Sequence, residues 1–411
     1  MTLAIDPAAV ERLIRDLGAI GAHSGTGVWR TVYSPEWVAA NAFLFRTFAE
    51  AGLTPRQDTV GNVWGRLEGR EGGKSIVSGS HVDSQCPGGR YDGALGIIAA
   101  LVAVTALRER YGIPRRTIEV LSLCEEEGSR FPANFWGSRA ITGNIAAGEA
   151  DNIVDADGAT IGAAMQAVGL TPERIAESKR DDIDSFVELH IEQGPILEHA
   201  GLSVGVVDAI TGPRHTEVRL TGLQNHAGAF PMDLRKDPMA GFAEIAGSLI
   251  AMAERMGRPA VTTIGRCVVY PNAGAVIPRS VTFTIDARHP DPAARQHMYA
   301  LQDALVREVA ERRGLGLETL VLIEKEPCLS TPELVATIRK AAETEGIATL
   351  TMASGAGHDT QQMAAIAKVA MIFVRSKEGR SHTPEEFSSI ADIVDGIRVL
   401  AETLRLLAYD A

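Results

Sequence analysis

Histidine and acidic residues stand at several points where an apolar run of the chain ends. His81 ends the run SIVSGSH, Asp83 stands two residues further on, and Asp92 lies in the turn-rich segment CPGGRYDG. Imidazole and carboxylate groups without thiolates are typical ligands of catalytic divalent ions, and a carboxylate placed between two ions bridges them. This pattern predicts a metal-dependent catalytic site. Further candidates follow later apolar runs: Glu125–Glu127, His190, His358, Asp359 and His382.

Each residue alone has a simpler interpretation. A single histidine at a strand end is more often a hydrogen-bonded loop residue than a metal ligand, and an acidic triplet is more often a solvated turn. His382 could simply precede a helix capped by Thr383, and His358 and Asp359 could hold a glycine turn together. The shared placement of the set after apolar strands favours metal binding. Asp83, on the same strand face as His81, is expected to orient its imidazole from the second coordination shell.

Strand and helix patterns alternate around these residues. A buried strand over 74–84, an apolar helix over 94–112 and a second strand over 117–127 predict a parallel sheet, and ligand sites lie beyond the carboxyl ends of parallel strands. Another short strand ends at His190, and VAMIFVRS is a further one. We therefore expect an α/β fold with a mixed, mainly parallel sheet flanked by helices.

The pattern changes between residues 212 and 326. Two helical segments and four alternating segments follow the order β-α-β-β-α-β, which predicts an inserted ferredoxin-like domain. Residues 1–211 and 327–411 would then form the catalytic metal-binding domain. An open sheet edge of the inserted lid domain is expected to form a homodimer.

Composition limits the partners. The formal net charge of -12 argues against nucleic acid or an anionic membrane as the main partner. The first twenty residues read as an amphipathic helix without the basic start and apolar block of a signal peptide, and no apolar run reaches the ~20 residues that span a bilayer. Four separated cysteines without a CxxC pair suit reduced thiols in the cytoplasm.

Seven motifs carry a resemblance that covers essentially the whole chain: GSHVD, GRYDGALG, EEEGSRFP, ELHIEQGP, NHAG, SGAGHD and SHTPEE. In this order they resemble the dinuclear-metal amidohydrolases of ureido and carbamoyl amides, within the aminoacylase and metallo-carboxypeptidase clan. That family includes allantoate amidohydrolases, N-carbamoyl-L-amino-acid hydrolases, ureidoglycolate amidohydrolases and β-ureidopropionases. YSPEW, EEEGSRFP and FWGS look most like the allantoate branch.

The resemblance implies two divalent metal ions per subunit, Zn²⁺ or Mn²⁺, with Co²⁺ and Ni²⁺ as alternatives. Asp92 would bridge them, and Glu126 would be the general base that moves a proton from water to the leaving nitrogen. The other implied ligands are His81 and His190 at one ion, and Glu127 and His382 at the other.

The resemblance also implies substrate-binding residues. His226 would stabilise an oxyanion in the active site of the partner subunit, and its alternative is a turn histidine in a glycine-rich loop. Arg288 would hold a substrate carboxylate, because a guanidinium fork matches that group, and its alternative is a surface arginine. The remaining implied substrate contacts are Gln193, Asn272 and Gly357.

One segment departs from the family pattern. The loop PNAGAVIPRS keeps Asn272 but has Ala275 where a second asparagine usually binds the substrate carboxylate, and Arg279 where glycine is usual. This change bears on substrate choice and leaves the metal chemistry untouched. Cys86 and Arg90 receive no role, and Glu125 is expected to be structural or solvent-facing.

The motifs therefore predict a metal-dependent hydrolase that releases ammonia from a linear ureido or carbamoyl amide. Allantoate is the first expectation, with an N-carbamoyl-L-amino acid or ureidoglycolate as alternatives. A dipeptidase or N-acyl-amino-acid deacylase of the same clan is a second hypothesis, which the segment HIEQGP disfavours. A metal-bound scaffold without activity is a third, which an intact Glu126 beside a full ligand set disfavours.

Overall fold

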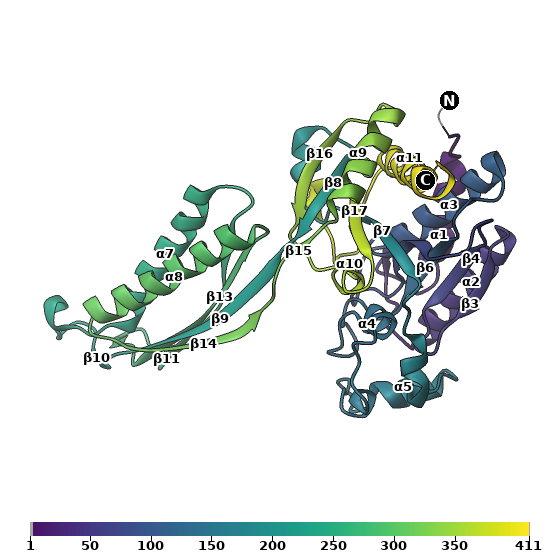
Figure 1. The fold of residues 1–411 in the computed structure, drawn as a ribbon. Helices are drawn as coiled ribbons and strands as arrows, with labels where there is room; N and C mark the ends of the chain where they lie inside the picture. The colour runs from purple at the N-terminus through teal and green to yellow at the C-terminus, as the bar shows by residue number, and fades with distance from the viewer. Residues whose placement is uncertain (1–2, 411) are drawn as a thin grey trace. The chain divides into compact units, whose positions relative to one another are not determined.

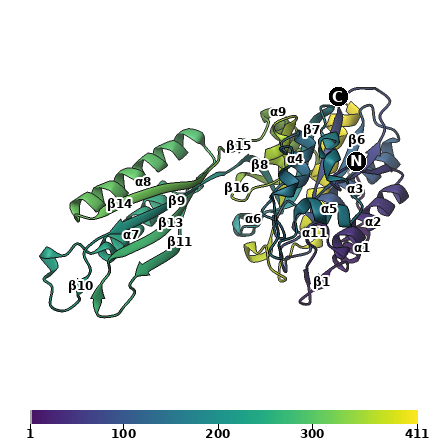
Figure 2. The same ribbon diagram turned by 90° about the horizontal axis from the view of Figure 1, so that it is seen from below.

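The computed structural model describes residues 3–410 and divides into two units. One unit holds the residues up to Asp208 and those from Ser330 onward, and the other is Ala209–Leu329. The domain limits predicted from the sequence, 212 and 326, fall close to these boundaries. Figures 1 and 2 draw the ribbon of the chain from two directions.

A nine-stranded sheet forms the centre of the first unit. Its middle consists of four parallel strands in the order β17 (Lys368–Val374), β7 (Ile183–Ile191), β5 (Ser75–His81) and β6 (Ile118–Leu123). Antiparallel neighbours extend it on both sides: β8 (Val204–Ile210) pairs with β17, and β4 (Val63–Leu67) pairs with β6. The predicted α/β fold is confirmed. The remaining strands are β3 (Thr54–Gln57), β15 (Cys328–Leu329) and β16 (Thr349–Ser354).

Helices pack against this sheet and against one another. The apolar helix α3 (Ala94–Tyr111) contacts β5, β6 and β7, and it also contacts α1 (Pro7–Gly18) and α11 (Ile390–Arg405). Because α3 lies between strands and helices, most of its side chains are buried, which explains its nearly continuous apolar sequence. The other long helices are α2 (Pro35–Glu50) and α9 (Pro332–Glu345), and the short ones are α4 (Trp136–Thr142), α5 (Ile161–Ala167), α6 (Ile196–Ala200) and α10 (Thr360–Met363).

Gly93 begins α3 without a side-chain cap and with a φ of 64°. A Cβ atom built there would lie 2.4 Å from the ring of His81, so only glycine allows the chain to turn this closely from Asp92 into the helix. The start of α3 thereby fixes the imidazole at the end of β5.

The second unit has an antiparallel sheet in the order β11-β13-β9-β14 and its own core. In chain order its elements are β9 (Gly212–Thr221), α7 (Pro238–Met256), β11 (Val261–Tyr270), β13 (Ser280–His289), α8 (Pro292–Arg312) and β14 (Gly316–Glu324). Alternate residues of β13, namely Val281, Phe283 and Ile285, are buried within this core. The predicted β-α-β-β-α-β arrangement is confirmed.

Several local expectations change. The first helix begins at Pro7, after Asp6 caps it by accepting a hydrogen bond from the Ala8 N–H, and the predicted residues 1 and 2 lie outside the described part. No helix follows Thr383 directly, because α11 begins at Ile390 with Ser389 as its cap. Among residues 3–410 no helix combines the length and apolarity needed to cross a bilayer.

Candidate metal centre

The predicted ligands come from loops and strand ends on one edge of the parallel sheet. His81 is the last residue of β5, Glu127 follows β6, and His190 lies next to the end of β7. His382 lies in the loop after β17, and Asp92 lies in the loop between β5 and α3. Because β17, β7, β5 and β6 are parallel neighbours, their carboxyl ends bring together side chains that are far apart in the sequence.

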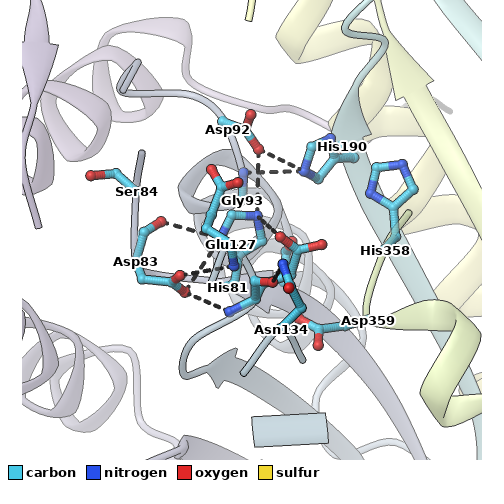
Figure 3. A network of polar contacts seen from close by, with 12 residues as sticks. His81, Asp83, Ser84, Asp92, Gly93, Glu127, Asn134, His190, His358 and Asp359 are labelled. Carbon is cyan, nitrogen blue, oxygen red and sulfur yellow. Dashed lines mark hydrogen bonds and ion pairs between the residues drawn. The ribbon is translucent and has the colours of Figure 1, made fainter. Parts of the chain in front are cut away.

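Asp92 is shared by two groups of ligand atoms. Its Oδ1 lies 3.4 Å from His81 Nε2 and 3.1 Å from His190 Nε2. Its Oδ2 lies 3.5 Å from His382 Nε2, and that nitrogen lies 3.5 Å from Glu127 Oε2. Each carboxylate oxygen of Asp92 therefore faces a different group, which is the arrangement expected of a bridging ligand. Figure 3 shows Asp92 above His81, with His190 to one side.

Burial and crowding of charge dominate the electrostatics. Burial alone would lower the pKa of His81, but the carboxylates of Glu126, Asp83 and Asp92 raise that pKa well above its ordinary value. Burial opposes ionisation of Asp92, yet its contacts with His190 and His81 bring the pKa of Asp92 well below its ordinary value. Burial and the nearby Asp92 raise the pKa of Glu127 to about 8. The site is thus a buried acidic region with few compensating cations.

This donor set fits divalent metal ions. Imidazole nitrogens and carboxylate oxygens converge without a thiolate, and the buried Oε1 of Glu127 has no hydrogen-bond partner among the described residues. A bound cation would satisfy that oxygen and offset the repulsion between Glu127 and Asp92. His81, His190 and Asp92 would hold one ion, and Asp92, Glu127 and His382 the other.

Glu126 stands beside these groups without belonging to either. Its Oε2 lies 3.9 Å from His81 Nε2, and its side chain is buried. Burial, together with the neighbouring Glu127 and Asp359, raises the pKa of Glu126 well above its ordinary value. A carboxyl group with a raised pKa next to the ligands is suited to accept and return a proton.

Asp83 does more than the sequence predicted. Its Oδ1 lies 3.6 Å from His81 Nδ1, and that same Oδ1 accepts a hydrogen bond from the backbone N–H of Glu126 at 3.1 Å. Its Oδ2 accepts one from the N–H of Glu127, also at 3.1 Å. Asp83 therefore fixes the acidic loop after β6 to the end of β5. The strand pattern of the sequence could not predict these two hydrogen bonds between Asp83 and the loop after β6.

A third group of potential ligand atoms, Glu188, His190 and His358, lies behind His190. Glu188 already accepts hydrogen bonds from the hydroxyls of Ser80 and Thr360, both at 2.6 Å. The ring of His358 packs edge-on against that of His190 at 4.6 Å, and burial lowers the pKa of His358 well below its ordinary value. We assign this group to the scaffold, in line with the structural interpretation of His358.

Two predicted substrate contacts lie in the first unit. Gln193 Nε2 donates to Asp92 Oδ2 at 2.8 Å, and the buried Oε1 of Gln193 has no partner among residues 3–410. Gly357 is exposed in the turn before His358, where a Cβ would lie 3.0 Å from Gln361 Oε1. Gln193 therefore lies within the ligand network itself.

The other predicted substrate contacts, His226, Asn272 and Arg288, belong to the second unit. His226 Nδ1 accepts hydrogen bonds from the N–H groups of Gly228 and Ala229, so in the neutral ring Nε2 carries the proton. The short pair β10 (Asn225–His226) and β12 (Val276–Ile277) sets His226 beside the loop that contains Ala275. These hydrogen bonds hold the ring of His226 within its own turn, and its role in stabilising an oxyanion stays a prediction.

Arg288 forms two 2.9 Å contacts with the carboxylate of Asp286, through Nε and Nη2. Asn272 is exposed and adopts a left-handed backbone with a φ of 57°. The guanidinium fork of Arg288 is therefore held in one orientation by a neighbour on the same strand, so a substrate carboxylate would share it with Asp286.

Three residues without an assigned function can now be placed. Glu125 is fully buried and accepts a hydrogen bond from the Phe131 N–H, so the solvent-facing alternative is wrong. Arg90 donates to the carbonyl of Thr26, which indicates a structural role. Cys86 is half-buried, and burial raises the pKa of its thiol, which favours the protonated form.

Comparisons with known proteins agree with this architecture. Residues 79–406 match the model of Peptidase family M20/M25/M40. The chain is 41% identical to the allantoate amidohydrolase of Escherichia coli (strain K12) over 98% of both chains, and 36% identical to the N-carbamoyl-L-amino-acid amidohydrolase of Paenarthrobacter aurescens over 97% of both. A crystal structure of an amidase of the hydantoinase/carbamoylase family from Burkholderia multivorans aligns with a TM-score of 0.91, at 33% identity over 98% of each chain. The chain belongs to the M20/M25/M40 family.

The resemblance inferred from the motifs is thereby confirmed. The family match begins two residues before His81 and ends one residue beyond α11, so it includes every predicted metal ligand. Within the M20 family, the two curated relatives named above, which match along nearly the whole chain, are amidohydrolases of non-peptide carbon–nitrogen bonds. This M20 chain is an amidohydrolase.

Proposed function

We propose that the protein hydrolyses a linear ureido or carbamoyl amide and releases ammonia, with allantoate as the first substrate to test. The observation that carries metal-dependent hydrolysis is the shared Asp92, whose two oxygens face His81 and His190 on one side and His382 on the other. The 41% identity to an allantoate amidohydrolase supports the choice of substrate.

The side chains divide the chemistry between them. When bound, two divalent ions would supply Lewis acidity for the amide carbonyl and lower the pKa of water. Glu126 would take a proton from the attacking water and return it to the leaving nitrogen, since its carboxylate belongs to neither ligand group. The Nε2–H of His226 would stabilise the oxyanion in the partner subunit's site.

The acid end of the substrate is assigned to Arg288 and Asn272. Arg288 presents a fork that is already oriented by Asp286, which reduces the conformational freedom lost on binding. Ala275 removes one amide donor from the loop beside His226. This loss bears on which substrate is bound, and an N-carbamoyl-L-amino acid is the second candidate.

Ammonia release from metal-loaded protein is the direct test. Allantoate, N-carbamoyl-L-amino acids and ureidoglycolate form one panel, and dipeptides with N-acetyl amino acids form the other. We expect turnover only in the first panel. Turnover confined to the second panel would favour the peptidase or deacylase hypothesis, and no turnover in either would refute the proposed reaction.

The metal requirement has its own test. Chelation should abolish activity and added Zn²⁺ or Mn²⁺ should restore it, with Co²⁺ and Ni²⁺ as alternatives, because all four accept nitrogen and oxygen ligands. Inductively coupled plasma analysis should find two ions per chain. Full activity in a chain shown to be free of metal would contradict the two-ion site.

We also propose a homodimer through the second unit and a cytoplasmic location, consistent with four free cysteines. The edge strand β14 exposes apolar side chains, with Leu320 at 58% and Leu322 at 50% exposure. An uncovered apolar edge is a pairing surface. Light scattering should give a dimer, and the double variant Leu320→Lys/Leu322→Lys should shift it towards monomer, whereas an unchanged mass would exclude this edge.

A further inference from the structure

Glu386 connects two loops that carry ligands of the same predicted ion. It is 3% exposed and lies four residues after His382, in the motif SHTPEE. Its Oε1 accepts hydrogen bonds from the backbone N–H groups of Tyr91 and Asp92, both at 2.9 Å. Residues almost three hundred positions apart in the sequence are thus joined at the bridging carboxylate.

The other oxygen of Glu386 reaches the Asp92 side chain through a hydroxyl. Ser381 Oγ lies 2.9 Å from Glu386 Oε2 and 2.6 Å from Asp92 Oδ2. A hydroxyl has one proton to donate, so Ser381 serves one carboxylate at a time. Asp92 Oδ2 is the oxygen that faces His382, so these contacts orient the half of Asp92 that belongs to the Asp92–Glu127–His382 group.

The side chain of Glu386 is also closely packed against the loop that carries Asp92. A Cβ atom added to Gly89 would lie 2.0 Å from Glu386 Oε1, so the Asp92 loop approaches this carboxylate as closely as backbone can. The residues next in sequence also meet, because the rings of Tyr91 and Phe387 form an edge-on pair at 6.0 Å. Polar and aromatic contacts therefore fix the same two loops to each other.

We propose that Glu386 is a positioning residue that sets the distance between Asp92 and His382 and thereby chiefly the affinity of the ion held by Asp92, Glu127 and His382, while the other ion, which shares Asp92, is affected less. The proposal rests on the two-ion site of the proposed function. Among the described residues Glu386 forms no hydrogen bond or ion pair with His81 or His190, and these two histidines are held by β5, β7 and Gly93. Loss of Glu386 should therefore separate the two affinities.

Binding of Co²⁺ or Zn²⁺ alone, without substrate, tests the proposal. Titration against a competing chelator should show two ions in the wild-type chain. In Glu386→Ala one affinity should fall about 10–100-fold, the usual effect of losing a group that orients a metal ligand, and the other should fall less. Glu386→Gln keeps an oxygen that can accept from both N–H groups, so its metal affinities should be closer to those of the wild-type chain.

Gly89→Ala provides an independent variant that keeps the carboxylate but displaces it, and it should copy Glu386→Ala. The matched controls are Glu385→Ala, the exposed neighbour in the same loop, and Gly72→Ala, where an added Cβ meets nothing within 4 Å. Both controls should keep two ions at wild-type affinity. In ammonia-release assays the lowered kcat of Glu386→Ala should recover at saturating metal, with KM unchanged.

Three outcomes would overturn the proposal. The first is a wild-type chain that binds no second ion, and the second is a Glu386→Ala variant that binds both ions with wild-type affinity. The third is an equal loss of both affinities together with a lower Tm of the metal-free chain, because that result indicates a general structural role. A wild-type chain that binds two ions but hydrolyses no ureido compound would refute the proposed reaction alone.

Discussion

At the residue scale, neighbouring glutamates have different surroundings. Glu125, Glu126 and Glu127 are consecutive, yet Glu125 bonds to the backbone, Glu126 faces His81, and Glu127 joins His382 and Asp92. In an irregular loop the side chains do not alternate regularly in direction, so three consecutive carboxylates can point in three directions. Glu125 adopts a left-handed backbone with a φ of 49°, which turns the chain at this point. This turn therefore places Glu127 among the predicted metal ligands and leaves Glu126 free to transfer protons.

The first prediction concerns Glu126. Glu126→Gln removes the proton acceptor but keeps the shape of the side chain, so kcat should fall by roughly 10²–10⁴. Two ions should remain bound, because the carboxylate belongs to neither ligand group. Glu127→Gln is the comparison, and it should lose one ion. Wild-type kcat in Glu126→Gln would contradict the assignment of the base.

A second prediction uses Asp359, whose Oδ1 accepts a 2.5 Å hydrogen bond from Ser138 while its buried Oδ2 has no partner among residues 3–410. Burial, with Glu188 nearby, raises the pKa of Asp359 from 3.8 to about 8. The folded chain therefore holds a proton that the unfolded chain releases, and this contribution to stability is lost as the pH rises from about 4 to about 8.

Asp359→Asn keeps a neutral side chain at every pH. The Tm of this variant relative to wild type, both in chelator, should therefore rise from pH 5 to pH 8 and level off above about pH 9. The corresponding change in the free energy of unfolding, relative to wild type, is at most about 1.4 kcal/mol per pH unit. Differential scanning fluorimetry across this range checks it, and a difference that does not vary with pH would contradict the raised pKa.

At the element scale, the close approach of β5 and β6 sets the ligand positions. Gly79 lies opposite Leu121 in this parallel pair, and a Cβ at Gly79 would come within 1.8 Å of the Leu121 carbonyl oxygen. His81 stands two residues beyond Gly79, and Asp83 then holds the loop after β6. The distance between β5 and β6 therefore also sets the distance between His81 and the acidic loop after β6.

The third prediction follows from this contact. Gly79→Ala should destabilise the first unit by about 1–3 kcal/mol or more, because backbone cannot move aside as a side chain can. It should also weaken metal binding through His81. Gly72→Ala, with an open surrounding, is the control. Thermal unfolding and metal titration measure both effects, and wild-type values for Gly79→Ala would show that the strands can separate at no cost.

At the scale of the whole molecule, two hydrophobic cores are separate. The core of the first unit includes the α3 residues Ile97 and Val104, and that of the second includes Phe283 and Tyr299. All five predicted metal ligands belong to the first unit. A ligand that binds only the folded form of one unit stabilises that unit alone.

The fourth prediction is that calorimetry of the full chain gives two unfolding transitions in chelator. Added Zn²⁺ should raise the Tm of one transition, and the isolated segment 209–329 should reproduce the other, without a response to Zn²⁺. A single transition that shifts as a whole would mean that the two cores unfold together.

The sequence by itself determined the family, the α/β class, the inserted β-α-β-β-α-β unit and the set of residues suited to bind metal. These follow from local periodicity and from motifs, which are properties of neighbouring residues. Tertiary structure decided which oxygen of Asp92 faces which histidine, that Glu125 is buried, and that Asp83 and Glu386 bind backbone N–H groups of distant loops. Those contacts join segments through strand order and loop packing, so no spacing along the chain encodes them.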